Sequence, residues 1–170
     1  METLRIVGLA MLSAVGYGVL HDQVTARICV EYFTIGHPVI YPTSSPTLLG
    51  IIWGVVATWW MGLALGILLA LCARLGPRPK LTVRQMRRPI ALLLAVVGVC
   101  AVAAGGLGGL LARAGQVWLV EPLATMVPRE RHIPFLIDLW SHSASYVAST
   151  VGGLALSVWA WRKRSEASSS

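Results

Sequence analysis

The sequence predicts an all-α, polytopic integral membrane protein that forms a four-helix bundle. Hydrophobic residues make up 56% of the 170-residue chain, charged residues make up only 12%, and the mean hydropathy is +0.71. Soluble domains of this size carry about a quarter charged residues, so the missing charge indicates a lipid environment. The apolar runs are long and do not alternate with polar residues, and a backbone in lipid must satisfy its own hydrogen bonds. Helices are therefore predicted rather than strands.

Four apolar stretches approach or exceed the roughly 20 helical residues that are needed to cross about 30 Å of hydrocarbon. They cover residues 4–20, 47–73, 89–112 and 143–161. The first is the shortest, and its basic start also resembles a signal peptide, but no small-residue cleavage site follows, so an uncleaved signal-anchor is favoured. Residues 1–164 are predicted to form one transmembrane domain, and residues 165–170 a disordered tail.

Basic residues are divided unequally between the two sides of this four-span arrangement. The side that holds both termini carries Arg5, Arg74, Arg78, Lys80, Arg84, Arg87, Arg88, Arg162, Lys163 and Arg164. The other side carries only Arg27, Arg113, Arg129 and Arg131. The positive-inside rule then predicts a bacterial-type inner membrane protein with both termini in the cytoplasm. Topology accounts for the net charge of +7, so no nucleic-acid partner is predicted, and the 74–88 connection is expected to contact anionic lipid headgroups.

Small residues recur at every fourth position in three of the predicted spans. The second span carries Gly50, Gly54, Thr58, Gly62, Gly66 and Ala70, the third carries Ala101, Gly105 and Gly109, and the fourth carries Ser141, Ser145, Ser149, Gly153 and Ser157. Such stripes let helix backbones approach closely in lipid. They predict a compact bundle, or alternatively a homo-oligomer or an assembly with another membrane protein.

Every histidine and most of the acidic residues fall on the outer side of this arrangement. The candidate metal ligands come from both outer connections and are His21, Asp22, Glu31, His37, His132, Asp138 and His142. Imidazole and carboxylate groups suit a divalent transition metal such as zinc, copper, iron or nickel, and three ligands with an open position form a catalytic site. No spacing matches a strong motif such as H-E-x-x-H, so the metal, the catalytic residues and whether the protein is an enzyme stay open.

The two outer connections are expected to approach each other, because both emerge on the same side. His21, Asp22 and His37 would then lie near Asp138 and His142. The last two are four residues apart, so on a helix they would converge on one ion, or the carboxylate would orient the imidazole. The competing interpretation is that these residues cap helices and bond to loop backbone. A proton or ion pathway is disfavoured, because the middles of the spans carry no Asp, Glu, Lys, Arg or His.

Other nucleophilic side chains give weaker signals. The chain has three cysteines and no C-x-x-C, which argues against a thiol oxidoreductase. Cys29 faces the outer side and is either a soft ligand, a reactive thiol or, as is commoner, a half-buried one. A hydrolase would have to use Ser141 or Ser143 beside His142, and no G-x-S-x-G is present.

The first outer connection also carries a recognisable pattern. His-Asp-Gln-Val-Thr at 21–25 is followed by Cys29, by Glu-Tyr-Phe-Thr at 31–34 and by His-Pro at 37–38. This run resembles a loop in uncharacterised small integral membrane proteins of bacteria. The resemblance implies that the connection is one unit, and it implies no activity and no catalytic residue.

Two functions are therefore predicted from the sequence. The first is an integral membrane protein whose His/Asp/Glu-rich outer face binds a metal ion or polar ligand, with a metal-dependent membrane enzyme as its sharpest form. The alternative is a non-catalytic assembly or interaction subunit that packs through the Gly and Ser stripes.

Overall fold

The computed structural model describes residues 1–166, and these form seven α-helices and one short 3-10 turn with no strand among them. The elements are α1 (Glu2–Ile28), α2 (Val30–Thr34), α3 (Pro46–Val56), α4 (Trp59–Arg74), α5 (Val83–Arg113), α6 (Leu123–Met126), η1 (Arg129–Arg131) and α7 (His132–Glu166). The all-α prediction is confirmed for this part of the chain. Ser165 and Glu166 were assigned to the predicted tail but belong to α7, and residues 167–170 of that tail lie outside the described part.

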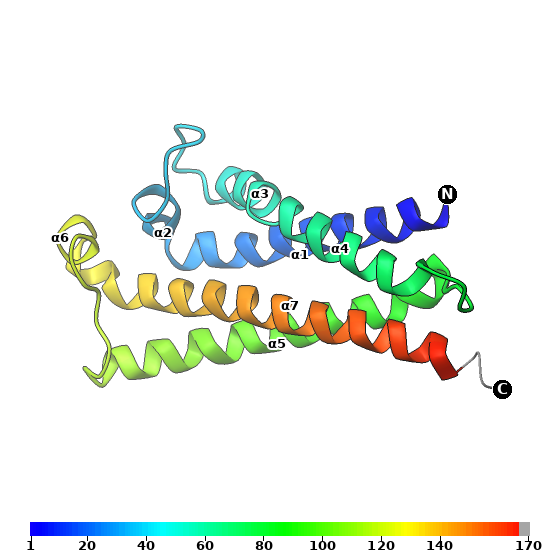
Figure 1. Ribbon diagram of the computed structural model, residues 1–170. Helices are drawn as coiled ribbons and strands as arrows, with labels where there is room; N and C mark the ends of the chain where they lie inside the picture. Colours follow the sequence, from blue (N-terminus) through cyan, green and yellow to red (C-terminus); the bar gives the residue numbers. More distant parts are fainter. Residues whose placement is uncertain (167–170) are drawn as a thin grey trace.

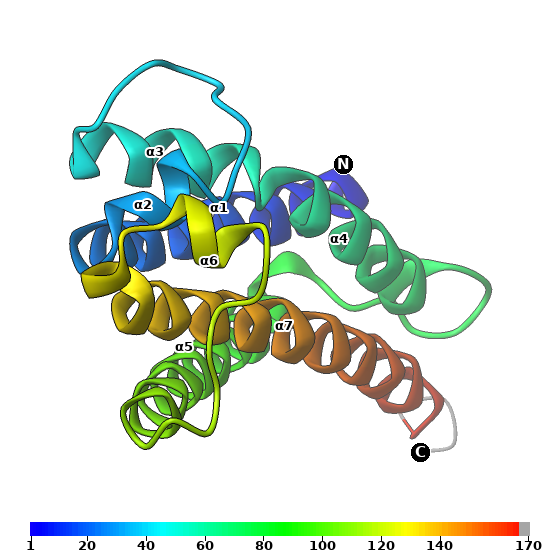
Figure 2. The same cartoon turned by 90° about the vertical axis from the view of Figure 1, so that its left-hand side faces the viewer.

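The long helices form two layers that run side by side. Figures 1 and 2 show α1 with α3 and α4 in one layer, and α5 with α7 in the other. The short helices α2 and α6 gather at one end of the molecule, and the start of α1 and the end of α7 lie at the other end (Figure 1). The layers therefore place the connection after α1 beside the start of α7.

Three helical stretches are long and apolar enough to cross a membrane, namely Glu2–Ile28, Pro46–Arg74 and Val83–Arg113. They correspond to the first three predicted spans. Helix α7 has 35 residues and is long enough, but polar side chains such as Ser141, His142 and Ser145 interrupt its apolar surface. These three side chains are buried, so they face other helices.

The first helix is longer than the predicted span 4–20. Helical hydrogen bonding continues to Ile28, since no proline or glycine lies between residues 19 and 28, and the Thr25 hydroxyl donates to the carbonyl of His21. His21 and Asp22 were predicted to lie in a connection. The structure instead places both on α1, where a rigid helix fixes their directions.

The second predicted span, 47–73, is a broken helix. It separates into α3 and α4 at Ala57 and Thr58, although no proline is present there. The Thr58 hydroxyl donates to the carbonyl of Gly54, and a threonine bonded to the carbonyl four residues earlier bends a helix. The break exposes the Ala57 carbonyl, which accepts a long hydrogen bond of 3.5 Å from the Tyr146 hydroxyl.

The predicted small-residue stripes are packing faces inside the molecule. A Cβ atom at Gly54 would lie 2.5 Å from the Cα of Val19, and one at Gly62 would lie 2.7 Å from the Cβ of Ala14. In the other layer, a Cβ atom at Gly109 would lie 2.9 Å from the Ile137 side chain. These separations leave no room for a side chain, so the expectation of close helix packing is confirmed at these positions.

A buried arginine closes the end of the molecule that holds the termini. Arg164 is 0% exposed, and its guanidinium donates hydrogen bonds of 2.7–3.2 Å to the carbonyls of Cys72, Leu75, Arg78 and Pro79. Two of these carbonyls belong to the last turn of α4 and its C-cap, which have no partner within the helix. The end of α7 is thereby fixed to the end of α4.

Candidate metal centre

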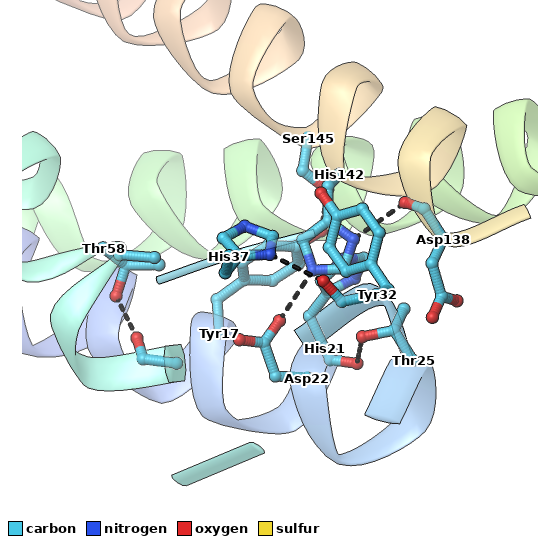
Figure 3. Close-up of polar contacts among 12 residues, drawn as sticks. Tyr17, His21, Asp22, Thr25, Tyr32, His37, Thr58, Asp138, His142 and Ser145 are labelled. Carbon is cyan, nitrogen blue, oxygen red and sulfur yellow. Dashed lines mark hydrogen bonds and ion pairs between the residues drawn. The ribbon is translucent and has the colours of Figure 1, made fainter. Parts of the chain in front are cut away.

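Three of the seven candidate ligands meet between the two layers. His21 and Asp22 come from α1 and His142 comes from α7, and one ligand atom from each lies within 4.8 Å of the others. The Nε2 atom of His142 is 3.1 Å from the Oδ1 atom of Asp22, and the rings of His21 and His142 are 4.6 Å apart (Figure 3). The expected approach of His21 and Asp22 to His142 is confirmed.

The hydrogen bonds of His142 determine which of its ring nitrogens is available to a metal ion. Its Nδ1 atom lies 2.8 Å from the backbone carbonyl of Asp138. Because a carbonyl only accepts, Nδ1 carries a proton, and Nε2, which faces Asp22, is the nitrogen whose lone pair a metal ion would take. Metal-ligating histidines are commonly held in this way, with one nitrogen donating to a carbonyl and the other facing the ion.

His21 contributes a buried nitrogen that lacks a partner. Its Nε2 atom is buried and makes no hydrogen bond within the described residues, while the ring stacks on Tyr17 at 5.6 Å. Asp22 is 4% exposed, and its Oδ1 atom faces the Nε2 atom of His142. Buried polar atoms nearly always have a partner, so the unsatisfied nitrogen marks a place where a further group would be stabilising.

Tyrosine and serine side chains surround this cluster. The ring of Tyr32 stacks on His142 at 4.5 Å, and the Tyr17 hydroxyl is 2.9 Å from the Ser145 hydroxyl (Figure 3). Ser145 was predicted only as a packing residue, and Tyr17 was not predicted as part of a site. Tyr17 lies four residues before His21, one turn away on the same helix face, and this spacing could have indicated it.

No family model, curated protein or solved structure matches this chain.

His37 lies beside the cluster and not in it. Its ring is 4.8 Å from the ring of Tyr32 and 4.7 Å from that of Trp53, and its Nδ1 atom is 2.8 Å from the Tyr32 carbonyl. Burial lowers the pKa of His37, which keeps the ring neutral at neutral pH. Its position matches the interpretation in which an outer histidine bonds to loop backbone.

Glu31 belongs to a separate ion pair. Its carboxylate accepts hydrogen bonds from Arg131 at 2.8 Å and from the Cys29 thiol at 3.3 Å. Burial acts to raise the pKa of Glu31. The hydrogen bonds from Arg131, from the backbone of Glu31 and from Cys29, together with the positive charge of Arg131, outweigh this effect and lower the pKa. Burial also raises the pKa of Cys29 to about 12, so its thiol stays protonated and is a packed group rather than a nucleophile.

The remaining two candidates also stand apart from the cluster. His132 places its Nε2 atom 3.0 Å from the Val127 carbonyl, at the start of α7. The Asp138 side chain is 0% exposed, and its two carboxyl oxygens have no hydrogen-bond partner within residues 1–166. The expectation that this carboxylate orients His142 is corrected, because the backbone carbonyl of Asp138 holds the ring instead.

A cleft extends from the cluster between the two layers, and we call it the interlayer cleft. It has a volume of about 100 Å³ and a mostly apolar lining, which includes Ala10, Leu65, Leu94 and Leu156. Its ionisable lining groups lie at the cluster end and include His21, Asp22 and His142, whereas Ser149 lines the part beyond them. Ala57 and Thr58, where the α3–α4 helix breaks, form part of its wall.

Proposed function

We propose that this chain is a four-span integral membrane protein that holds one divalent transition-metal ion between His21, Asp22 and His142. The observation that carries the proposal is the convergence of three ligand atoms within 4.8 Å, from two helices whose contacting residues Asp22 and His142 are 120 positions apart in sequence. The unpartnered nitrogen of His21 supports it further, because a metal ion would satisfy this atom.

The donor set fits a catalytic type of site. Two imidazoles and one carboxylate suit zinc or ferrous iron, with metal–ligand distances of about 2.0–2.2 Å. Two such ligands on one ion lie a little over 3 Å apart, close to the 3.1 Å between His142 and Asp22. Three protein ligands leave a coordination position open, and the adjoining interlayer cleft gives it room for a substrate. The most specific version of the proposal is that the protein is a metal-dependent membrane enzyme.

Metal analysis of the purified protein tests this function. Protein extracted in a mild detergent without chelator and then loaded with Zn²⁺ is expected to retain about one zinc ion per chain after gel filtration. A protein that retains no stoichiometric metal at neutral pH, with zinc, iron or copper, would rule the proposal out.

The membrane arrangement is a second part of the proposal. We take α7 as the fourth span, with the cluster near the outer surface and both termini in the cytoplasm of a bacterial-type cell. The common end of the two termini and the excess of basic residues at that end support this arrangement (Figure 1).

Reporter fusions test the orientation. A reporter after the last residue and one inserted within residues 78–84 are both expected to be active in the cytoplasm, because the basic residues on that side resist translocation. Fusions within residues 38–44 provide the control and are expected to report the periplasm. A periplasmic signal from either of the first two fusions would contradict the arrangement.

The alternative function, a non-catalytic subunit that assembles through its Gly and Ser stripes, has less support. Gly54, Gly62 and Gly109 already pack against helices of the same chain. A homo-oligomer or a membrane partner would have to use other faces, and it stays a prediction.

A further inference from the structure

We propose that the interlayer cleft binds a long-chain fatty acid, with its alkyl chain between the two layers and its carboxylate at the metal. This inference rests on the proposed metal site and names the class of ligand for its open position. Three properties of the cleft support it, namely its length, its polarity and the charge at its outer end.

The length of the cleft matches one alkyl chain. The lining residues on α1 run from Ala10 to Asp22, which is about 18 Å at 1.5 Å per helical residue. Half of a bilayer's hydrocarbon is about 15 Å thick, so the cleft is about as long as one acyl chain. Its volume of about 100 Å³ encloses only part of such a chain and is far too small for a lipid with two chains, so the alkyl chain would lie along the open side of the cleft.

The polarity of the lining changes along the cleft. Leu69, Leu94 and Leu156 line the part nearer the termini, whereas Tyr17, Ser145 and the metal cluster line the other end. A lipid in the outer leaflet has the same orientation, with its polar head at the outer surface and its chain toward the middle. The alkyl chain would bury apolar surface, and the head would meet the polar groups.

The charge at the polar end favours a single carboxylate. A divalent ion bound to Asp22 and two neutral imidazoles leaves one net positive charge in a buried site. Buried charges are costly unless they are paired, and one fatty-acid carboxylate would neutralise the centre. A carboxylate oxygen is also a standard ligand for such ions, at about 2.0–2.2 Å, so it would occupy the open position.

Cobalt-substituted protein provides a direct test, because the visible spectrum of Co²⁺ responds to its ligands. The Co²⁺-loaded full chain would be placed in nanodiscs of ether-linked phospholipid, which release no fatty acid, and titrated with palmitate. We expect a saturable change in the spectrum. Hexadecanol, which has the chain without the carboxylate, and acetate, which has the carboxylate without the chain, are expected to cause no such change at the same concentrations.

A pair of neighbouring variants connects the spectral change to the cleft. Ser149 lines the cleft and is half-buried, whereas Thr150 is exposed and does not line it. Ser149→Phe would fill the cleft without touching the metal ligands, and we expect it to weaken palmitate binding by about tenfold or more. Thr150→Phe is expected to bind palmitate as the unchanged protein does. Retention of Co²⁺ by both variants shows that they are folded.

The outcomes separate the two proposals. If the chain binds Co²⁺ but palmitate leaves its spectrum unchanged, the fatty-acid inference is wrong and the metal site stands. Equal responses to palmitate and acetate, or equal affinities of Ser149→Phe and Thr150→Phe for palmitate, would also overturn the inference, because the cleft would then have no part in binding. Failure of the unchanged protein to hold Co²⁺ or Zn²⁺ would remove the metal site itself.

Discussion

His142→Ala is expected to abolish metal retention while the protein still inserts into the membrane. The change removes one of three ligands and leaves two on α1, so metal affinity is expected to fall by more than the 10- to 100-fold that the loss of an outer-shell partner causes. Metal content per chain after gel filtration measures the effect. The amount of protein in the membrane fraction reports insertion.

Two further variants make this result specific. His132→Ala removes a histidine from the same helix that contacts the Val127 carbonyl and lies outside the cluster, so it is expected to retain metal. Asp22→Asn preserves the size of the side chain and removes its charge, and it is expected to lose metal as His142→Ala does. Equal metal content in His132→Ala and His142→Ala would show that the ion, if any, binds elsewhere.

Gly54→Leu is expected to lower the free energy of unfolding by about 1–3 kcal/mol or more. A Cβ atom at this position would lie 2.5 Å from both the Cα and the N of Val19, so α1 and α3 would have to move apart. The backbone cannot yield as a flexible side chain does. Equilibrium unfolding in mixed detergent micelles measures the change.

Gly16→Leu is the matched control, because it makes the same substitution on the facing helix. A Cβ atom at Gly16 would have no neighbouring atom within 4 Å, so the added side chain would point into open space. We expect a change of about 0.5 kcal/mol or less. Equal losses of stability in the two variants would mean that α1 and α3 are not packed closely through Gly54.

The features that could be predicted from the sequence depend on local patterns. The three apolar spans and the Gly stripe follow from hydrophobic length and four-residue periodicity, which a single helix carries by itself. The meeting of His21 with His142 followed from a topological argument, since both outer connections emerge on one side. The agreement is partial, because His37 and His132 share that side and stay outside the cluster.

The features that the sequence did not reveal depend on side-chain conformations that residue spacing does not determine. The break at Ala57 and Thr58 arises where the Thr58 hydroxyl donates to a carbonyl of its own helix. The hydrophobic periodicity of the sequence does not indicate whether a threonine forms this bond. Asp138 and His142 lie four residues apart on α7, so their side-chain rotamers decide which oxygen of Asp138 meets the imidazole. Spacing alone suggested the carboxylate, whereas the backbone carbonyl accepts the hydrogen bond.

The four carbonyls around Arg164 fix the position of α7 along its own axis. Sliding this helix along its axis by one residue would move it by about 1.5 Å. The Arg164 guanidinium would then lose its hydrogen bonds to the carbonyls of Cys72, Leu75, Arg78 and Pro79. His142 stands on the same helix, about 33 Å along its axis from Arg164. Because α7 is one continuous helix, the contacts of Arg164 fix its position along the axis. They thereby determine where His142 meets Asp22, although that meeting point lies at the opposite end of the bundle.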